Sequence, residues 1–178
     1  MKIKNACMGQ MFPTKSGSVI IKEIISRSNI TVEFIQTGYI KTNVTLDNLA
    51  RGSVKDPTAK SVYGVGYLGE GYTKGDLKNK SYTLWANMIK RCYAEGFDWY
   101  EGVTVCERWH NYSNFKEDIK LLAGYEEWIK ENGKYELDKD VLSGKHKTYS
   151  PFTCCFLPST MNRQLTKVTK AQNNLSLF

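Results

Sequence analysis

The sequence is poor in proline and histidine and has no long hydrophobic run. Four prolines and two histidines occur among 178 residues, and no single residue type dominates, so a wholly disordered chain is not expected. No stretch approaches the roughly 18 apolar residues of a membrane span. The segment from Met1 to Cys7 lacks the apolar centre of a secretory signal. We therefore expect a globular protein of the cytoplasm that contacts no membrane.

Pairs of cysteines at zinc-binding spacing are also absent. The chain has five cysteines but no Cys-x-x-Cys pair, and zinc binding is accordingly not expected. A site distributed along the chain remains as the alternative, with Cys92, Cys106 and Cys154 joined by His110. In a cytoplasmic protein we otherwise expect reduced thiols, most of them packed in the core.

Positive charge is concentrated at the two ends of the chain. Residues 1–60 carry nine Lys and Arg against four Asp and Glu, and residues 61–140 carry eleven against fourteen. Residues 141–178 carry five basic side chains and no carboxylate. Basic segments of this kind gain affinity for nucleic-acid phosphates by releasing condensed counterions. The charge distribution predicts a polyanionic partner.

Short β-branched runs fill the N-terminal part and predict a small β-rich domain over 1–50. The runs are Val19–Ile21, Ile24–Ile25, Ile30–Ile35 and Ile40–Leu46, and Ser26–Asn29 supplies a turn. Residues 51–80 are rich in glycine and read as a connector. The Gly64–Gly69 stretch lacks the strand, the helix and the Gly-Lys-Ser/Thr sequence of a phosphate-binding loop, so a nucleotide site is not expected.

Helical periodicity begins after the connector. Leu84, Trp85, Met88, Ile89 and Cys92 form one apolar stripe and predict a helix over 81–94, capped by Ser81. Lys90 and Arg91 near its end are available to phosphates. A strand at 103–106 and a helix over about 112–123 follow. Residues 137–142 and 152–157 are then expected to form a hairpin, and 158–172 a last helix. The fold class is α+β, with domains at 1–50 and 81–178.

A series of motifs in the second half resembles a bacteriophage protein family described as HNH homing-endonuclease-like, some of whose members carry an appended DNA-binding domain of the plant-transcription-factor type. The residues that carry the resemblance are Tyr82, Trp85, Met88, Arg91, Cys92, Tyr93, Tyr100, Gly102, Val103, Val105, Cys106, Arg108, Trp109, Phe115, Leu137, Asp138, Lys139, Asp140, Tyr149, Ser150, Pro151, Thr153, Cys154 and Asn162. The resemblance covers about 82–165 and implies a phage origin and DNA as the ligand.

The resemblance also implies a site. An HNH module is a β-hairpin followed by a helix, and together they hold one divalent metal. Asp138 falls on the metal-binding acid and Asn162 on the helix ligand, with Mg²⁺ as the implied cofactor. Lys139 stands at the position of the general-base histidine, and Thr153 at that of the asparagine that orients it. These replacements leave two interpretations open: a metal-dependent nuclease, or a nuclease-like protein that has lost cleavage.

Three further assignments concern individual residues. Asp138 and Asp140 alternate on the expected strand and could share a metal ion, or they could form ion pairs with neighbouring lysines. His146 is the alternative general base, but because Lys145 and Lys147 flank it, a phosphate contact or a solvated turn residue is the more common role for such a histidine. The expected DNA-binding residues are Lys145 and Lys147 in the hairpin loop with Arg163, Lys167 and Lys170 on one face of the last helix.

The sequence thus predicts a protein of the host cytoplasm that binds double-stranded DNA. Whether it also nicks the DNA with Mg²⁺ is left open by the replacements at Lys139 and Thr153. Its candidate catalytic residues are Asp138, Lys139, His146 and Asn162, and its candidate metal ligands are Asp138, Asp140 and Asn162. The alternative is a catalytically inactive phage protein that binds and inhibits a host defence or transcription protein, using the acidic middle of the chain.

Overall fold

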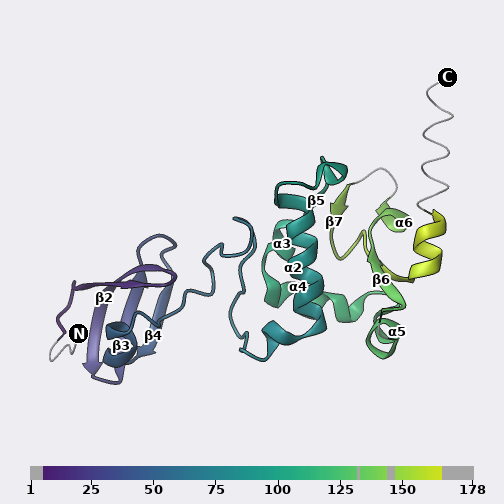
Figure 1. Cartoon of the computed structure of the whole chain (residues 1–178). Coiled ribbons are helices and arrows are strands. Elements are labelled where there is room, and N and C mark those ends of the chain that lie inside the picture. Colours follow the sequence, from purple (N-terminus) through teal and green to yellow (C-terminus); the bar gives the residue numbers. More distant parts are fainter. Residues whose placement is uncertain (1–5, 132, 144–146, 166–178) are drawn as a thin grey trace. The chain divides into compact units, whose positions relative to one another are not determined.

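The chain forms two units, each described here by itself. The computed structural model describes residues 6–131, 133–143 and 147–165. Unit 1 comprises residues up to Ser61 together with Tyr67–Glu70, and unit 2 comprises Val62–Gly66 and the residues from Gly71 onward. The segment expected as a connector, 51–80, is therefore divided between the two units. Both strands and helices occur (Figure 1), and the expected α+β class is confirmed.

Unit 1 is a four-stranded antiparallel sheet followed by one short helix. The strands pair in chain order: β1 (Met11–Thr14), β2 (Gly17–Ser26), β3 (Asn29–Phe34) and β4 (Ile40–Val44). The turn expected at Ser26–Asn29 joins β2 and β3, with Ser26 opposite Asn29. Helix α1 (Leu46–Ala50) begins after Thr45, whose hydroxyl accepts a hydrogen bond from the Asn48 N–H.

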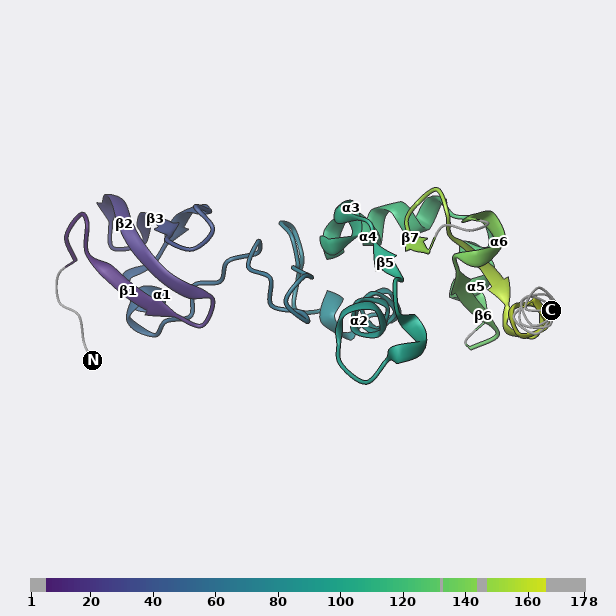
Figure 2. The ribbon, with the colours of Figure 1, turned by 90° about the horizontal axis from the view of Figure 1, so that it is seen from above.

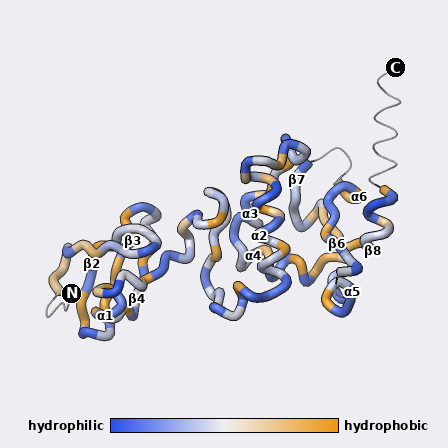
Figure 3. Tube along the Cα trace, in the orientation of Figure 1, coloured by the Kyte–Doolittle hydropathy of each residue, from blue (hydrophilic) through white to orange (hydrophobic). Residues whose placement is uncertain are grey.

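The core of unit 1 follows from the alternation of its strands. Side chains of a strand point alternately to its two faces, and β3 buries Ile30, Val32 and Phe34 while its intervening residues are half-exposed. Figure 3 shows hydrophobic and hydrophilic residues interspersed along these strands. Leu46 and Leu49 of α1 are buried in the same cluster. The β-rich domain expected from the sequence is thus present, and α1 completes its core.

Unit 2 is built from short helices and two-stranded pairs (Figure 2). Its helices are η1 (Asp76–Lys78), α2 (Lys80–Tyr93), η2 (Asp98–Tyr100), α3 (Glu107–His110), α4 (Tyr112–Asp118), η3 (Ile119–Leu121), α5 (Tyr125–Lys130) and α6 (Asp140–Ser143). Its strands are β5 (Thr104–Val105) and β7 (Thr148–Tyr149), which pair in parallel, and β6 (Tyr135–Asp138) and β8 (Cys155–Pro158), which pair antiparallel. A further helical segment covers 159–165.

The apolar stripe predicted on α2 is the centre of the unit 2 core. Trp85, Met88 and Ile89 are fully buried, together with Trp109 and Phe115. The indole N–H of Trp85 donates to the Trp109 carbonyl oxygen at 2.7 Å, so this large side chain leaves no polar group unpaired in the core. The predicted cap differs: Asn79 precedes the first turn, and the Ser81 hydroxyl instead contacts the Tyr112 hydroxyl at 3.0 Å.

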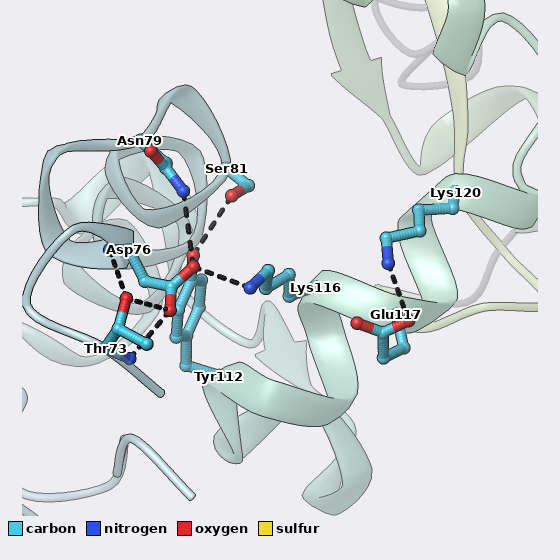
Figure 4. A network of polar contacts seen from close by, with 8 residues as sticks. All are labelled: Thr73, Asp76, Asn79, Ser81, Tyr112, Lys116, Glu117 and Lys120. Carbon is cyan, nitrogen blue, oxygen red and sulfur yellow. Dashed lines mark hydrogen bonds and ion pairs between the residues drawn. The ribbon is translucent and has the colours of Figure 1, made fainter. Parts of the chain in front are cut away.

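A polar network joins the residues before α2 to α4 (Figure 4). The buried Asp76 carboxylate accepts hydrogen bonds from the Thr73 N–H at 2.7 Å and from the Lys116 ammonium at 2.6 Å. These hydrogen bonds, the one from Lys116 foremost, lower the pKa of Asp76 to about 2. A buried carboxylate that is paired and hydrogen-bonded in this way stays ionised. The network fixes where the long helix begins.

No helix in the described ranges is both long enough and apolar enough to cross a membrane.

Candidate functional site

Two antiparallel strands and a following helix form the frame of the site. In the register of β6 and β8, Asp138 lies opposite Cys155, and helix 159–165 follows β8 directly (Figure 1). From this helix the Asn162 side-chain N–H donates to the Glu136 carboxylate of β6 at 3.0 Å. The strand pair differs from the simple hairpin expected at 137–142 and 152–157, because α6 and β7 lie between its strands in sequence.

Asp138 ends β6 and caps the helix that follows. Its Oδ1 accepts hydrogen bonds from the N–H groups of Asp140 and Val141 at 2.9 and 3.0 Å. A carboxylate that accepts such bonds at the start of a helix favours helix over strand. The expected continuation of the strand to residue 142 is therefore wrong. Asp138 and Asp140 do not alternate on one strand: Asp140 is the first residue of α6.

Lys139 lies between these two acids and is buried. Its ammonium forms an ion pair with the Asp140 carboxylate, most of which is exposed, and lies 5.7 Å from the centre of the Tyr149 ring. The alternative in which Asp140 pairs with a neighbouring lysine is thus present in the structure. A buried cation with one exposed partner can exchange that partner for another anion, such as a phosphate.

A pocket of about 760 Å³ lies beside this frame within unit 2. Residues of α2 and of the loop after it line it together with residues of β6, α6, β7 and helix 159–165. Its charged and amide residues are Asn87, Lys90, Arg91, Glu136, Asp138, Lys139, Asp140 and Asn162. The pocket brings together four residues predicted for catalysis or metal binding and adds two cations from α2.

Arg91 is the cation of the pocket that has an unpaired hydrogen-bond donor. Its Nε is buried without a hydrogen-bond partner, and its guanidinium carbon lies 5.4 Å from the centre of the Tyr100 ring. A buried donor without a partner costs free energy that a bound acceptor would recover. Tyr149 also lines the pocket. Burial, and to a smaller extent the neighbouring Tyr100, raises the pKa of the Tyr149 phenol far above its ordinary value. The Tyr149 hydroxyl is therefore a neutral group.

The remaining predicted residues are placed as follows. Lys147 and Arg163 are exposed, and the Lys147 ammonium is 3.5 Å from the Glu101 carbonyl oxygen. The Thr153 hydroxyl donates to the Thr148 carbonyl oxygen at 2.7 Å and accepts the Ser150 N–H at 3.0 Å. Thr153 thus stabilises a turn, and neither of these hydrogen bonds orients Lys139, the residue at the general-base position. Lys145, His146, Lys167 and Lys170 lie outside the described residues.

The cysteines of the distributed alternative have different surroundings. Cys92 lies on α2, Cys106 precedes α3, and Cys154 is buried. Burial raises the pKa of Cys92 to about 11 and of Cys154 to about 12, as is usual for cysteines packed in a core. The His110 Nε2 lies 3.1 Å from the Tyr93 hydroxyl. Within the described ranges, no three His, Cys, Asp or Glu side chains form a metal-binding group.

Sequence reasoning noted Arg91 only as a residue available to phosphates, and it missed the association of Arg91 with Lys139. The only sequence signal for this association was that Arg91 and Lys139 both belong to the series of motifs quoted for the resemblance. No family model matches the chain, and neither a curated protein nor a solved structure shows significant similarity to it.

Proposed function

We propose that unit 2 binds the phosphodiester backbone of double-stranded DNA in this pocket and nicks it in a reaction that depends on a divalent metal. The observation that carries the proposal is Arg91, whose buried Nε lacks an acceptor, in a pocket that also contains Lys139. Two cations converging on one cavity match the charge and geometry of a phosphate. The resemblance to HNH-like phage proteins supports DNA as the ligand and an infected bacterium as the place where the protein binds it.

Arg91 and Lys139 would contribute in different ways. The guanidinium is planar and presents several N–H groups to phosphate oxygens, whereas the ammonium is a compact charge. Because Lys139 is paired with Asp140, we assign it to charge stabilisation of the phosphate and leave proton abstraction to another group. Lys147 and Arg163 are exposed and would contact the backbone on either side of the pocket, as would the basic residues of the C-terminal segment.

The oxygen donors beside these cations suit a hard metal ion. Asp138, Asp140 and Asn162 line the same pocket, and carboxylate and amide oxygens of such residues are what Mg²⁺ binds in proteins. When bound there, the ion would polarise the phosphate and lower the pKa of a water molecule. Asp138 also keeps α6 in place through its two accepted N–H bonds, so it would position Asp140 in addition to binding the metal.

The first experiment measures affinity for a DNA duplex across a range of salt concentrations. We expect affinity to fall linearly with salt on logarithmic axes. Replacing Arg91 by Ala should weaken binding about 10- to 100-fold, since a hydrogen bond to a charged group contributes roughly 1.5–3 kcal/mol. Lys130→Ala is the matched control, because Lys130 is exposed on α5 and does not line the pocket. No salt-dependent binding would overturn the proposal and favour the host-protein inhibitor.

The second experiment incubates a supercoiled plasmid with Mg²⁺ or Mn²⁺. Asp138→Asn is the sharp variant, because asparagine keeps an oxygen that can cap α6 while it removes the charge of a metal ligand. We expect nicking in the wild type and its loss in Asp138→Asn, with the helical circular dichroism and the DNA affinity retained. Nicking that persists in this variant would exclude the metal assignment, and nicking by neither protein would limit the function to binding.

A further inference from the structure

One aromatic side chain at the pocket is exposed although its three counterparts are buried. Trp85, Trp109 and Trp128 are at most 3% exposed, whereas Trp99 is 75% exposed. Trp99 lies in η2 and lines the pocket together with Arg91. Exposed indole rings are costly and are common where a ligand covers them. Phe152 and Leu121 are also strongly exposed, but neither of them lines the pocket.

Neighbouring groups support the Trp99 ring and surround it with positive charge. The ring of Phe97 meets it edge-on, with centroids 5.6 Å apart and an interplanar angle of 63°. The Lys90 ammonium lies 5.7 Å from the Phe97 ring, and the Arg91 guanidinium lies against Tyr100. Aromatic rings interleaved with cations are the usual construction of surfaces that bind unpaired nucleotides: the bases stack on the rings and the phosphates meet the cations.

We propose that Trp99 stacks on a base of the nucleotide whose phosphate binds Arg91, and that this base is unpaired. The inference rests on the proposed function and specifies its substrate class: double-stranded DNA in which a base is unpaired or is opened locally. In an intact duplex both faces of each base are covered by neighbouring bases, so an indole can stack on one only after it leaves the stack. A mismatched or already unpaired site would therefore be the preferred ligand.

The fluorescence of Trp99 provides a direct assay, because it is the one exposed tryptophan of the four. Oligo-dT, a duplex with a central unpaired bubble, the same duplex fully paired, and an abasic strand of equal length are titrated into the full chain. We expect quenching by oligo-dT and by the bubble, and much less by the paired duplex. The abasic strand should bind without quenching, since it offers phosphates but no bases.

Variants separate stacking from general binding. Trp99→Ala should weaken oligo-dT binding by about tenfold or more, the usual effect of losing one base–aromatic stack, and Trp99→Phe should recover most of the loss. Phe152→Ala, which removes an exposed ring outside the pocket, should bind like the wild type. Trp99 and Phe152 are both exposed, so the three variants should keep the fold intact, as circular dichroism would verify.

The two proposals fail in different ways. If Trp99→Ala binds every DNA normally while Arg91→Ala still loses affinity, the stacking inference is wrong and the phosphate site stands. Equal affinity for the bubble and the paired duplex, with no quenching by either, would have the same meaning. If neither variant changes affinity, or no DNA binds, the proposed function itself fails and the stacking inference fails with it.

Discussion

Buried polar groups have different kinds of partners in the two units of the chain. In unit 1 the backbone groups are paired by a four-stranded antiparallel sheet with local irregularities of register, and the buried Asp56 accepts hydrogen bonds from neutral groups of Thr37 and Thr58. In unit 2 the elements are short, and the buried charges Asp76 and Lys139 each face an opposite charge. A sheet whose strands pair with one another needs few side-chain partners, whereas shorter elements depend on them. The unit in which Asp76 and Lys139 are buried charges with oppositely charged partners is also the one that contains the pocket.

The largest expected change in stability comes from a substitution in the unit 2 core, which tests whether the two units unfold separately. Trp109→Ala removes a fully buried ring of unit 2 and should destabilise that unit by about 3–5 kcal/mol. All four tryptophans belong to unit 2, so their fluorescence in a urea titration reports on that unit alone. The fluorescence midpoint should fall, while the β-sheet signal of unit 1 in circular dichroism should keep its own midpoint.

The reciprocal variant completes that comparison. Ile30→Ala in the unit 1 core should cost about 2–5 kcal/mol and should leave the fluorescence midpoint unchanged. If either substitution shifted both signals equally, the units would unfold as one cooperative body and the contrast drawn above would not extend to stability.

A smaller effect is expected where a glycine lets β8 approach α5. Gly124 precedes α5 with φ +79°, and a Cβ there would overlap the Phe156 carbonyl oxygen. Gly124→Ala should therefore cost about 2–4 kcal/mol, through left-handed strain and overpacking. Gly96→Ala has a similar φ, +82°, but meets nothing within 4 Å, and should show the strain alone. Equal losses in thermal unfolding would mean that the backbone gives way at β8.

The mildest prediction concerns acid. The folded-state pKa of Asp76, about 2, lies below its ordinary value, so the carboxylate stabilises unit 2 fully above about pH 4, and this contribution is lost as the pH falls toward 2. Asp76→Asn should lower stability at pH 7 and show a shallower decline below pH 4. Glu117→Gln breaks an exposed ion pair with Lys120 (Figure 4). This variant should change the urea midpoint little, both at pH 7 and below pH 4. A wild type and an Asp76→Asn variant with parallel pH profiles would contradict the assignment.

The predictability of the fold from sequence differed along the chain for identifiable reasons. Strands β2, β3 and β4 and helix α2 were predicted because β-branched runs mark the strands and an apolar stripe marks the helix. Strand β1 lies before the first of these runs and was missed. The parallel pair of β5 and β7 was missed, since two-residue strands have no periodicity of their own. The strand over 137–142 was predicted too long because Asp138 caps a helix, and local hydrophobicity does not reveal which N–H groups a carboxylate will accept.

For the site, the sequence by itself determined the residue types: a basic C-terminal segment, the acids around Lys139, and Asn162 one helix later. Only the tertiary structure decided that Arg91, 48 positions before Lys139 in the sequence, lines the same pocket, and that one tryptophan of four stays exposed there. The physical reason is that periodicity encodes which face of an element is buried. Which elements then meet depends on the packing of the whole core, a collective property that no local pattern contains.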